Sequence, residues 1–576
     1  MLKLARFLSA YKKECVIGPL FKFLEACFEL FVPLVTAVIV DEGVRNNDTA
    51  LILKMGTVMV GLGVLGLACS LTAQYFAAKA AMGFGTAVRS ALFRHVSRLS
   101  YADIDEIGVP SLITRLTEDV NQAQAGVNRL LRLFLRSPFI VAGALVMAFT
   151  VDAKTALVFL AATPVIALII RAVTISVLPR YRRIQGFLDR VALLTRENLA
   201  GVRVIRAFSK QSFEEERFAR ACGDLCGKQL AAGRIAALLN PATAVVVNAA
   251  VIGIVAVGGA QVDAGRLTQG EVIALVNYMS QILLALIALA DLTVISTKAF
   301  ASAGRIAEVL DLPAEPDETD DAVSTVDGAP RVEFRDVSFA YKGADVPALS
   351  GLSFAVPAGA TVGVIGGTGA GKSTLAALIA RFYAPTKGQI LLDGKELRTY
   401  APEDLRRKIG IVPQKAALFK GTVRANLLWR DRSATEEELW DALTVAQGAE
   451  FVRSRKDGLD AQIEQNGRNL SGGQRQRLTI ARALVGKPEI LILDDSASAL
   501  DFATDARLRK AIRAETKDAT VFLISQRVAT IRNADVIIVL DDGKIVGTGT
   551  HAALVDACPV YRDICLSQMS KDEAAA

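Results

Sequence analysis

Residues 362–374 read VGVIGGTGAGKST, and this stretch decides how the second half of the chain folds. An apolar run leads into Gly366-x-x-x-x-Gly371-Lys372-Ser373, and a second apolar run, LAALIARF, follows. The glycines allow backbone N–H groups to turn inward around phosphate oxygens, and the start of a helix adds its positive dipole end. The spacing predicts a strand, a phosphate-binding loop and a helix. A chance glycine-rich turn is the alternative, which the flanking apolar runs disfavour.

Each residue of this loop has an expected role. Lys372 should reach the β- and γ-phosphates of a nucleotide, and Ser373 should bind Mg²⁺. The residues expected to surround the nucleotide are Gly366, Gly367, Thr368, Gly369, Ala370, Gly371, Lys372, Ser373 and Thr374.

An acidic motif follows further along the chain. Residues 490–495 read ILILDD, which is a short apolar run ending in Asp494 and Asp495. Such a run is typical of a parallel strand that is buried on both faces. A carboxylate at the end of this strand commonly holds Mg²⁺ opposite a phosphate-binding loop. Asp494 is therefore the predicted partner of Ser373 at the metal.

The first half of the chain is much more apolar. Hydrophobic residues make up 52% of the 576 residues, which is unusual for a soluble protein and favours membrane spans. Six apolar stretches can each supply much or all of the ~20 residues that a helix needs to cross a bilayer core. They are residues 16–40, 55–78, 137–151, 155–177, 238–262 and 272–296. Within lipid these stretches must be helical, because no water is present to satisfy their backbone groups.

The loops between these stretches predict the orientation. Short segments such as NNDTA and VDAK alternate with two segments of more than fifty residues that are rich in Arg and Lys. The positive-inside rule places the long segments, and with an even number of spans both termini, in the cytoplasm. Their helical spacing predicts membrane helices that continue beyond the bilayer, and a separate soluble helical insertion is the alternative.

Composition also defines a boundary and excludes two classes. Residues 311–330 contain seven acidic residues, three Pro and no basic residue, as a solvated linker does. The expected domains are therefore an all-α transmembrane domain of six helices (1–310), a linker (311–330) and a P-loop α/β nucleotide-binding domain (331–576). Seven scattered Cys and two His disfavour a zinc site or a disulfide framework. The net charge of +7 is explained by the cytoplasmic loops, without a nucleic-acid partner.

A family resemblance lies between the two phosphate-site motifs. The segment LSGGQRQRLTIARAL contains Ser471, Gly472, Gly473 and Gln474, and resembles the signature sequence of ABC ATPases. The resemblance extends to Gln414 in IVPQ (the Q-loop), to the D-loop residues Ser498, Ala499, Leu500 and Asp501, and to Tyr341 in FAYKG (the A-loop, which stacks on adenine). The membrane half is similar to ABC exporters in ITRLTEDV and GVRVIRAF. The likeness covers nearly the whole chain.

The resemblance implies ATP and Mg²⁺ as cofactors and a second ABC half-transporter as partner. In this family two ATP-binding domains pair head to tail, and each ATP lies between one P-loop and the opposing signature. Residues 471–474 would then bind the partner's nucleotide, and Gln414 would join Ser373 and Asp494 at the metal. The positions expected to be catalytic are Lys372, Gln414, Asp495 and Gln526.

Two of these positions depart from the family pattern. The residue after Asp494 is usually the Glu that polarises the attacking water, and here it is Asp495; the switch position is usually His, and here it is Gln526. Asp is still a carboxylate and Gln can still hydrogen-bond a phosphate, so each change alone is compatible with a catalytically active site. A carboxylate withdrawn by roughly 1.5 Å can nevertheless slow a reaction on the order of 10²-fold. Together the changes resemble the degenerate-site chain of a heterodimeric bacterial exporter, with a symmetric homodimer as the alternative.

Several polar residues fall inside the apolar stretches. Lys22, Glu25 and Glu29 share one helix face in the first stretch. They are expected either to line a polar substrate cavity or to form an internal Lys–Glu pair. Asn248, Tyr278 and Gln281 of the fifth and sixth stretches are open to a substrate role or a helix-packing role.

The expected function is ATP-driven transport of a substrate across a prokaryotic cell membrane by alternating access. Closure of the ATP sites would be transmitted through residues 103–110 and 207–211. The alternatives are a nucleotide-sensing regulatory subunit and an importer with the exporter fold. Membrane lipid and a transported substrate are further expected partners, and the six spans exclude a soluble ATPase that acts on nucleic acid.

Overall fold

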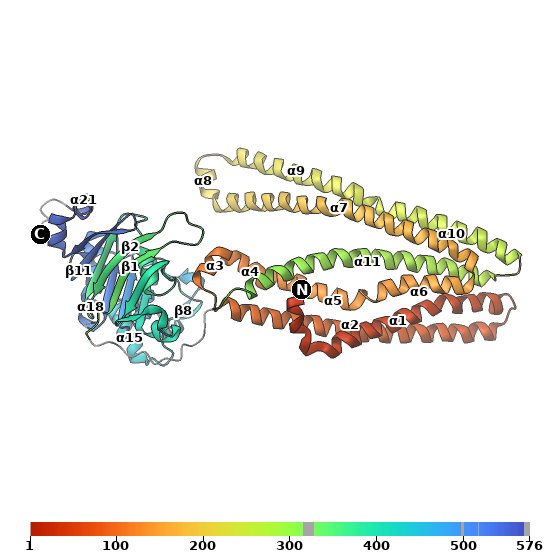
Figure 1. Ribbon diagram of the computed structural model, residues 1–576, viewed down its shortest axis with the longest axis horizontal. Helices are drawn as coiled ribbons and strands as arrows, with labels where there is room; N and C mark the ends of the chain where they lie inside the picture. Colours follow the sequence, from red (N-terminus) through yellow and green to blue (C-terminus); the bar gives the residue numbers. More distant parts are fainter. Residues whose placement is uncertain (1, 315–327, 497–499, 517, 570–576) are drawn as a thin grey trace. The chain divides into compact units, whose positions relative to one another are not determined.

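The computed structural model describes residues 2–314, 328–496, 500–516 and 518–569. Two compact units are present, one formed by Met1–Ser97 with Pro110–Leu312 and the other by Arg98–Val109 with Pro313–Ala576 (Figure 1). Most of the predicted linker, residues 315–327, lies outside the described residues.

The first unit is built from six long helical segments that have the length and apolar composition to cross a membrane. Its helices are η1 (Leu2–Tyr11), α1 (Lys12–Val38), η2 (Ile39–Val44), α2 (Thr49–Val96), α4 (Val109–Thr114), η3 (Arg115–Asp119), α5 (Val120–Leu133), α6 (Arg136–Val151), α7 (Ala153–Ala200), α8 (Val202–Ala207), α9 (Gln211–Ala237), α10 (Leu239–Asp263) and α11 (Gln269–Leu310). The prediction of six spanning helices is therefore confirmed.

Each short loop supplies a residue that caps the N-terminus of the next helix. Asp48 accepts a hydrogen bond from the backbone N–H of Leu51 at 3.0 Å and caps α2. Asp152 caps α7 through the N–H of Thr155 at 2.8 Å. Thr268 forms a capping box at the start of α11. Side-chain oxygens at these positions satisfy backbone donors that the first helical turn leaves free, so each short loop ends one helix and begins the next.

The long segment between the fourth and fifth spans is not one continuous helix. The sequence predicts that helical spacing persists through residues 194–221, but α7 ends at Ala200, α8 is a short separate helix and α9 begins at Gln211. Gly201 lies at the first break and Ser209 has a positive φ of 51° at the second. Glycine disfavours a helix interior, and a left-handed residue cannot continue one. The chain therefore reverses, and α9 packs beside α7 (Figure 1).

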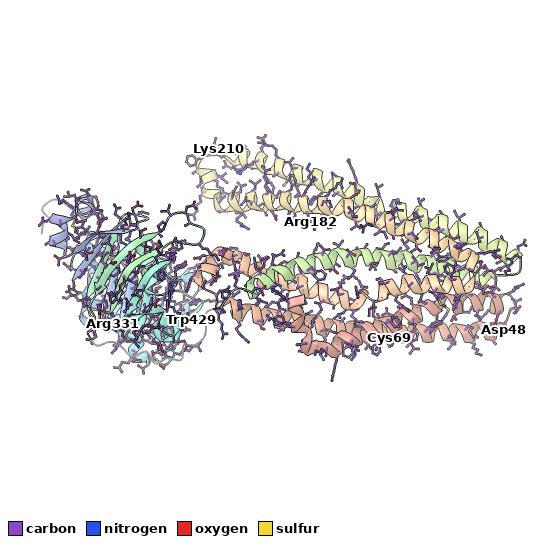
Figure 2. The ribbon with its side chains drawn as sticks, viewed as in Figure 1. Asp48, Cys69, Arg182, Lys210, Arg331 and Trp429 are labelled. Carbon is purple, nitrogen blue, oxygen red and sulfur yellow. The ribbon has the colours of Figure 1, made fainter. Side chains whose placement is uncertain are left out.

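The two kinds of loop lie at opposite ends of the first unit. Figure 2 shows Asp48, in the short loop before α2, at one end of the helices and Lys210, between α8 and α9, at the other. The charges of the first span are paired. Lys22 Nζ lies 2.6 Å from a carboxylate oxygen of Glu25, whereas Glu29 forms an ion pair of 2.6 Å with Arg136 of α6.

The polar residues of the sixth span hold helices together. Tyr278 donates to the carbonyl of Leu30 at 2.7 Å, and the Gln281 amide donates to the carbonyl of Glu29 at 3.3 Å. Both bonds link α11 to α1, so the structure gives these two side chains packing contacts.

The second unit contains a four-stranded sheet in the order β2-β1-β4-β5, a six-stranded sheet in the order β12-β11-β3-β10-β9-β6, and the pair β7-β8. Its strands are β1 (Val332–Phe339), β2 (Leu349–Val356), β3 (Thr361–Gly366), β4 (Lys387–Leu392), β5 (Lys395–Glu396), β6 (Ile409–Val412), β7 (Gly421–Thr422), β8 (Gln462–Ile463), β9 (Ile490–Asp494), β10 (Thr520–Ile524), β11 (Val536–Asp541) and β12 (Lys544–Gly549).

Helices surround these sheets. They are α3 (Tyr101–Ile107), α12 (Lys372–Ile379), η4 (Leu397–Thr399), α13 (Pro402–Lys408), α14 (Val423–Leu427), α15 (Glu436–Val445), α16 (Ala449–Arg453), η5 (Gly458–Asp460), η6 (Gln465–Gly467), α17 (Gly472–Leu484), α18 (Phe502–Glu515), α19 (Val528–Ile531), α20 (His551–Ala557) and α21 (Pro559–Gln568). The expected fold class, a six-helix membrane domain with an α/β ATPase domain, is confirmed.

Strand β9 explains why the ILIL run is uninterrupted. Ile490 and Ile492 face the core between the sheets, whereas Leu491 and Leu493 face the core of the helical region that includes α15 and α17. Both faces of the strand are buried, so an alternating polar pattern would place polar groups in a core. This burial fixes Asp494 at the end of the strand.

Candidate nucleotide-binding site

The predicted phosphate-site motifs meet at one edge of the six-stranded sheet. Strands β3, β10 and β9 are parallel neighbours, with Val364 opposite Ile524 and Ile524 opposite Asp494. Ligands of open α/β sheets bind beyond the carboxyl ends of such strands. The edge therefore collects the glycine-rich loop after β3, the two aspartates of β9 and the segment that follows β10.

Two glycines of the loop have no room for a larger residue. A side chain at Gly366 would collide with the backbone carbonyl of Leu540 in the neighbouring strand β11. Gly371 has a positive φ of 93°, and a Cβ there would lie 2.8 Å from the carbonyl of Ala348. The loop is thus held close to its own sheet and turns directly into α12, whose first backbone N–H groups point out of the helix.

Lys372 is a buried cation with neutral partners. Its Nζ donates to the carbonyls of Gly366 at 2.9 Å and Gly367 at 2.7 Å, and the residue is 9% exposed. Within the described part of the chain it makes no ion pair. Burial lowers the pKa of Lys372, and the charges of Asp495 and Asp494 oppose that shift. A desolvated cation of this kind attracts an anion strongly, so the loop fits a nucleotide phosphate.

Ser373 and the two aspartates lie beside this cation. Ser373 Oγ donates to Asp494 Oδ1 at 3.2 Å. Burial raises the pKa of Asp494, and the bond from Ser373 opposes the increase. Asp495 follows with a positive φ of 46°, and its backbone N–H donates to Ile524 at 2.8 Å. The Gln414 amide is 3.5 Å from Asp495 Oδ2, at the outer limit for a hydrogen bond.

The predicted adenine-stacking residue is next to the loop. Tyr341 is 39% exposed, and its hydroxyl lies 3.0 Å from Thr374 Oγ1. Phe339 and Tyr383 contact its ring edge-on, with centroid distances of 4.9 and 5.3 Å. A cavity of about 790 Å³ borders Tyr341 and is large enough for a nucleotide base.

Helix α3 forms part of the same cavity, through contacts that the sequence did not reveal. Tyr383 donates a short hydrogen bond to Asp105, and Lys342 Nζ lies 2.5 Å from Glu106. The ring of Tyr101 lies 4.6 Å from that of Phe382. We predicted a transmitting role for residues 103–110 but not these partners. The aromatic pair that follows the phosphate-loop helix, Phe382 and Tyr383, was the available signal.

The signature residues belong to a separate surface. Ser471 caps α17 by accepting from the N–H of Gln474 at 3.3 Å, while Gln474 Oε1 accepts from the N–H of Ser471 at 3.0 Å. Among the described residues, neither side chain bonds to the phosphate-binding loop. The surface is a helix start with Gly472 and Gly473 in its first turn, and is chemically suited to an anion.

The remaining predicted positions are placed as follows. Gln526 is exposed and lies in the segment that follows β10. Its backbone carbonyl accepts a hydrogen bond from the side chain of Gln568 at 2.7 Å. Gly367, Thr368 and Gly369 are exposed at the loop, whereas Ala370 is buried. Ser498 and Ala499 of the expected D-loop lie outside the described residues.

Comparison with known proteins agrees with both halves. The family model described as the ABC transporter transmembrane region matches residues 15–286, and that described as ABC transporter matches residues 349–498. An uncharacterized ABC transporter ATP-binding protein of Mycobacterium tuberculosis is 37% identical over 569 residues, covering 98% of this chain and 97% of that protein. A lipid A-core flippase of Hahella chejuensis is 32% identical over 517 residues, covering 90% of this chain and 88% of that protein.

A solved structure has the same architecture. A bacterial Atm1-family ABC exporter with ATP bound superposes with a TM-score of 0.81 at 25% identity, covering 98% of this chain and 99% of that one. The phosphate-binding loop, the buried lysine and the six apolar helices thus occur in one polypeptide that matches exporters along its length. The chain belongs to the ABC transporter family, as an exporter-type half-transporter that joins a membrane domain to an ATP-binding ATPase domain.

Proposed function

We propose that this chain is the degenerate-site half of a heterodimeric exporter. Half-transporters of this type dimerise and couple ATP hydrolysis to export across a membrane. In our proposal the chain binds MgATP at its own P-loop and hydrolyses it slowly. Most turnover then occurs where its signature completes the P-loop of a different partner chain.

The observation that carries the proposal is the pair of residues at the catalytic and switch positions. Asp495 stands where the family places Glu, and Gln526 stands where it places His. The side chain of Asp is one methylene shorter than that of Glu, which supports a base that is held back from the reacting water. The Gln526 amide can donate and accept hydrogen bonds, but it lacks an imidazole, whose two nitrogens can relay a proton.

Nucleotide binding is supported by residues that are intact. Lys372 is a buried cation facing neutral carbonyls, and Ser373 with Asp494 offers two oxygens 3.2 Å apart. Mg²⁺ takes few protein ligands and completes its shell with water and phosphate oxygens, so this small set fits it. Gln414 is the proposed third contact. The metal would neutralise phosphate charge, and Lys372 would orient the phosphates.

The signature supports activity at the second site. Ser471 and Gln474 form a complete capping box at an exposed helix start. Preorganised donors of this kind stabilise developing charge in a transition state. The chain thus retains the part that it would contribute to a partner, while the part that it would use itself is altered. We further propose that the long Arg-rich segments, both termini and the ATPase domain are cytoplasmic.

Two matched substitutions test the asymmetry in the purified complex. Ser471→Ala removes a donor from the partner's competent site and should lower steady-state ATPase activity on the order of 10²-fold. Asp495→Asn alters a base that is already misplaced and should change activity much less. Abolished activity in Asp495→Asn, as complete as after the equivalent change in the partner, would favour a symmetric homodimer.

A regulatory subunit that only senses nucleotide is the second possibility, and repair variants address it. Asp495→Glu combined with Gln526→His should restore turnover at this chain's own site when the partner's catalytic carboxylate is disabled. A complex that stays inactive after this repair would instead favour the regulatory role.

A further inference from the structure

The ATPase unit contains a second cavity that the proposed function does not use. Its volume is about 470 Å³. It is bordered by Gly359 and Thr361, where β3 begins, and by Ala519 and Val521, where β10 begins. These strands are parallel, and their opposite ends lie at the edge of the sheet where the P-loop follows β3. The cavity is therefore distinct from the nucleotide site.

The walls differ in character. Apolar side chains form one part, and they are Ile512, Ala519, Val521, Leu523 and Ala534. Cationic side chains from one face of α18 form another, namely Arg509, Lys510 and Arg513. An apolar body with a few polar groups is the usual composition of a small-molecule site of this size.

The cations are only partly neutralised. Arg509 forms an ion pair with Asp505 at 3.1 Å, and Arg513 forms one with Asp535 at 3.2 Å. Lys510 has no carboxylate partner in the part of the chain that the structure describes. The cavity wall thus has one positive charge in excess, which suits a ligand with a single negative charge.

Two buried polar atoms at this wall also need a partner. Thr530 is 8% exposed, and its hydroxyl has no hydrogen-bond partner among the described residues. The same holds for Arg509 Nε. Buried polar groups are nearly always bonded, so such atoms point to a missing ligand or water. An adjoining void bordered by Arg509 and Thr530 measures about 10 Å³, which is the lower limit for one water molecule. A neutral water there would not neutralise the charge of Lys510.

We propose that this cavity binds a small organic monoanion, a carboxylate with an apolar body. The anionic group would lie at the wall formed by α18, with Lys510 as its main charge partner, and the apolar body would cover Val521 and Leu523. Thr530 belongs to α19, which begins two residues after Gln526. A ligand here is therefore well placed to affect the segment that carries the switch residue.

Benzoate and benzamide are a matched pair of probes, because they share a ring and differ in charge. Saturation-transfer NMR on the full chain in lipid nanodiscs, with empty nanodiscs as blank, should show binding of benzoate and not of benzamide. Lys510→Gln removes the charge, keeps a polar side chain that is one atom shorter, and breaks no described ion pair. It should weaken benzoate binding about tenfold, as loss of one charge-assisted contact implies.

Arg507→Gln is the control, since Arg507 is exposed on the same helix and does not border the cavity. This variant should bind benzoate like the unmodified chain. Thr530→Val, which keeps the shape and removes the hydroxyl, should also weaken binding. Equal binding of benzoate and benzamide, or an unchanged benzoate Kd in Lys510→Gln, would overturn the proposal.

Discussion

Replacing Lys372 with Met removes the only cation of the phosphate-binding loop and keeps a side chain of similar length. Without nucleotide, two effects oppose each other. The variant loses the hydrogen bonds from the charged Nζ to Gly366 and Gly367, at 2.9 and 2.7 Å, each worth about 2 kcal/mol. It also no longer buries a charge, whose cost is reflected in the lowered pKa of Lys372. The free energy of unfolding without ATP should therefore change little.

The effect of ATP should change much more. A charge-assisted contact to phosphate is worth about 2 kcal/mol, so the Kd for ATP should rise about 30-fold. At an ATP concentration of about 100 times the original Kd, binding stabilises the original domain by about 2.7 kcal/mol. At the same concentration the variant would gain only about 0.9 kcal/mol. The rise in unfolding temperature should therefore fall from roughly 8 °C to roughly 3 °C for a domain of this size.

The chain offers a selective readout for this experiment. It has two tryptophans, Trp429 and Trp440, and both lie in the ATPase unit. Their fluorescence during heating follows this unit without a tryptophan signal from the membrane helices. Lys387→Met is the control, because Lys387 is exposed at the start of β4, and it should show the full shift with ATP. A full ATP-induced shift in Lys372→Met would refute the assignment of Lys372 to the phosphates.

Two further predictions concern contacts outside the loop. Arg305→Ala removes the partner that donates two hydrogen bonds to the carboxylate of Asp119, which is 2% exposed, and should destabilise the membrane unit by about 3 kcal/mol. Thermal loss of helical circular dichroism measures this change. Arg217→Ala is the control, because the ion pair of Arg217 is exposed and its loss should have little effect. Tyr383→Phe removes the hydrogen bond to Asp105, so amide hydrogen exchange in α3 should accelerate about tenfold. Lys342→Gln breaks exposed ion pairs and should barely change this exchange. Equal exchange in the unmodified protein and in both variants would contradict the role of Tyr383.

Local patterns were sufficient for much of the architecture. The six apolar stretches are visible because a bilayer permits only helices of about 20 apolar residues. The loop Gly366-x-x-x-x-Gly371-Lys372-Ser373 is visible because its backbone conformation requires glycine at fixed positions. The prediction failed at residues 201–210, where the helical spacing of apolar residues continues although the chain turns. A single glycine and one left-handed serine are weak signals beside that periodicity.

The sequence by itself determined which chemistry is present: a phosphate-binding loop, an acidic strand end, a signature motif and six membrane helices, each encoded within a short segment. Only the tertiary structure decided which of these groups meet. Asp494 comes to Ser373 because β9 and β3 flank β10, and Tyr383 comes to Asp105 because α3 packs beside Tyr341. The cavity at Lys510 and Thr530 likewise joins α18 to α19. Such contacts depend on strand order and packing between distant segments, and no local spacing of residues specifies them.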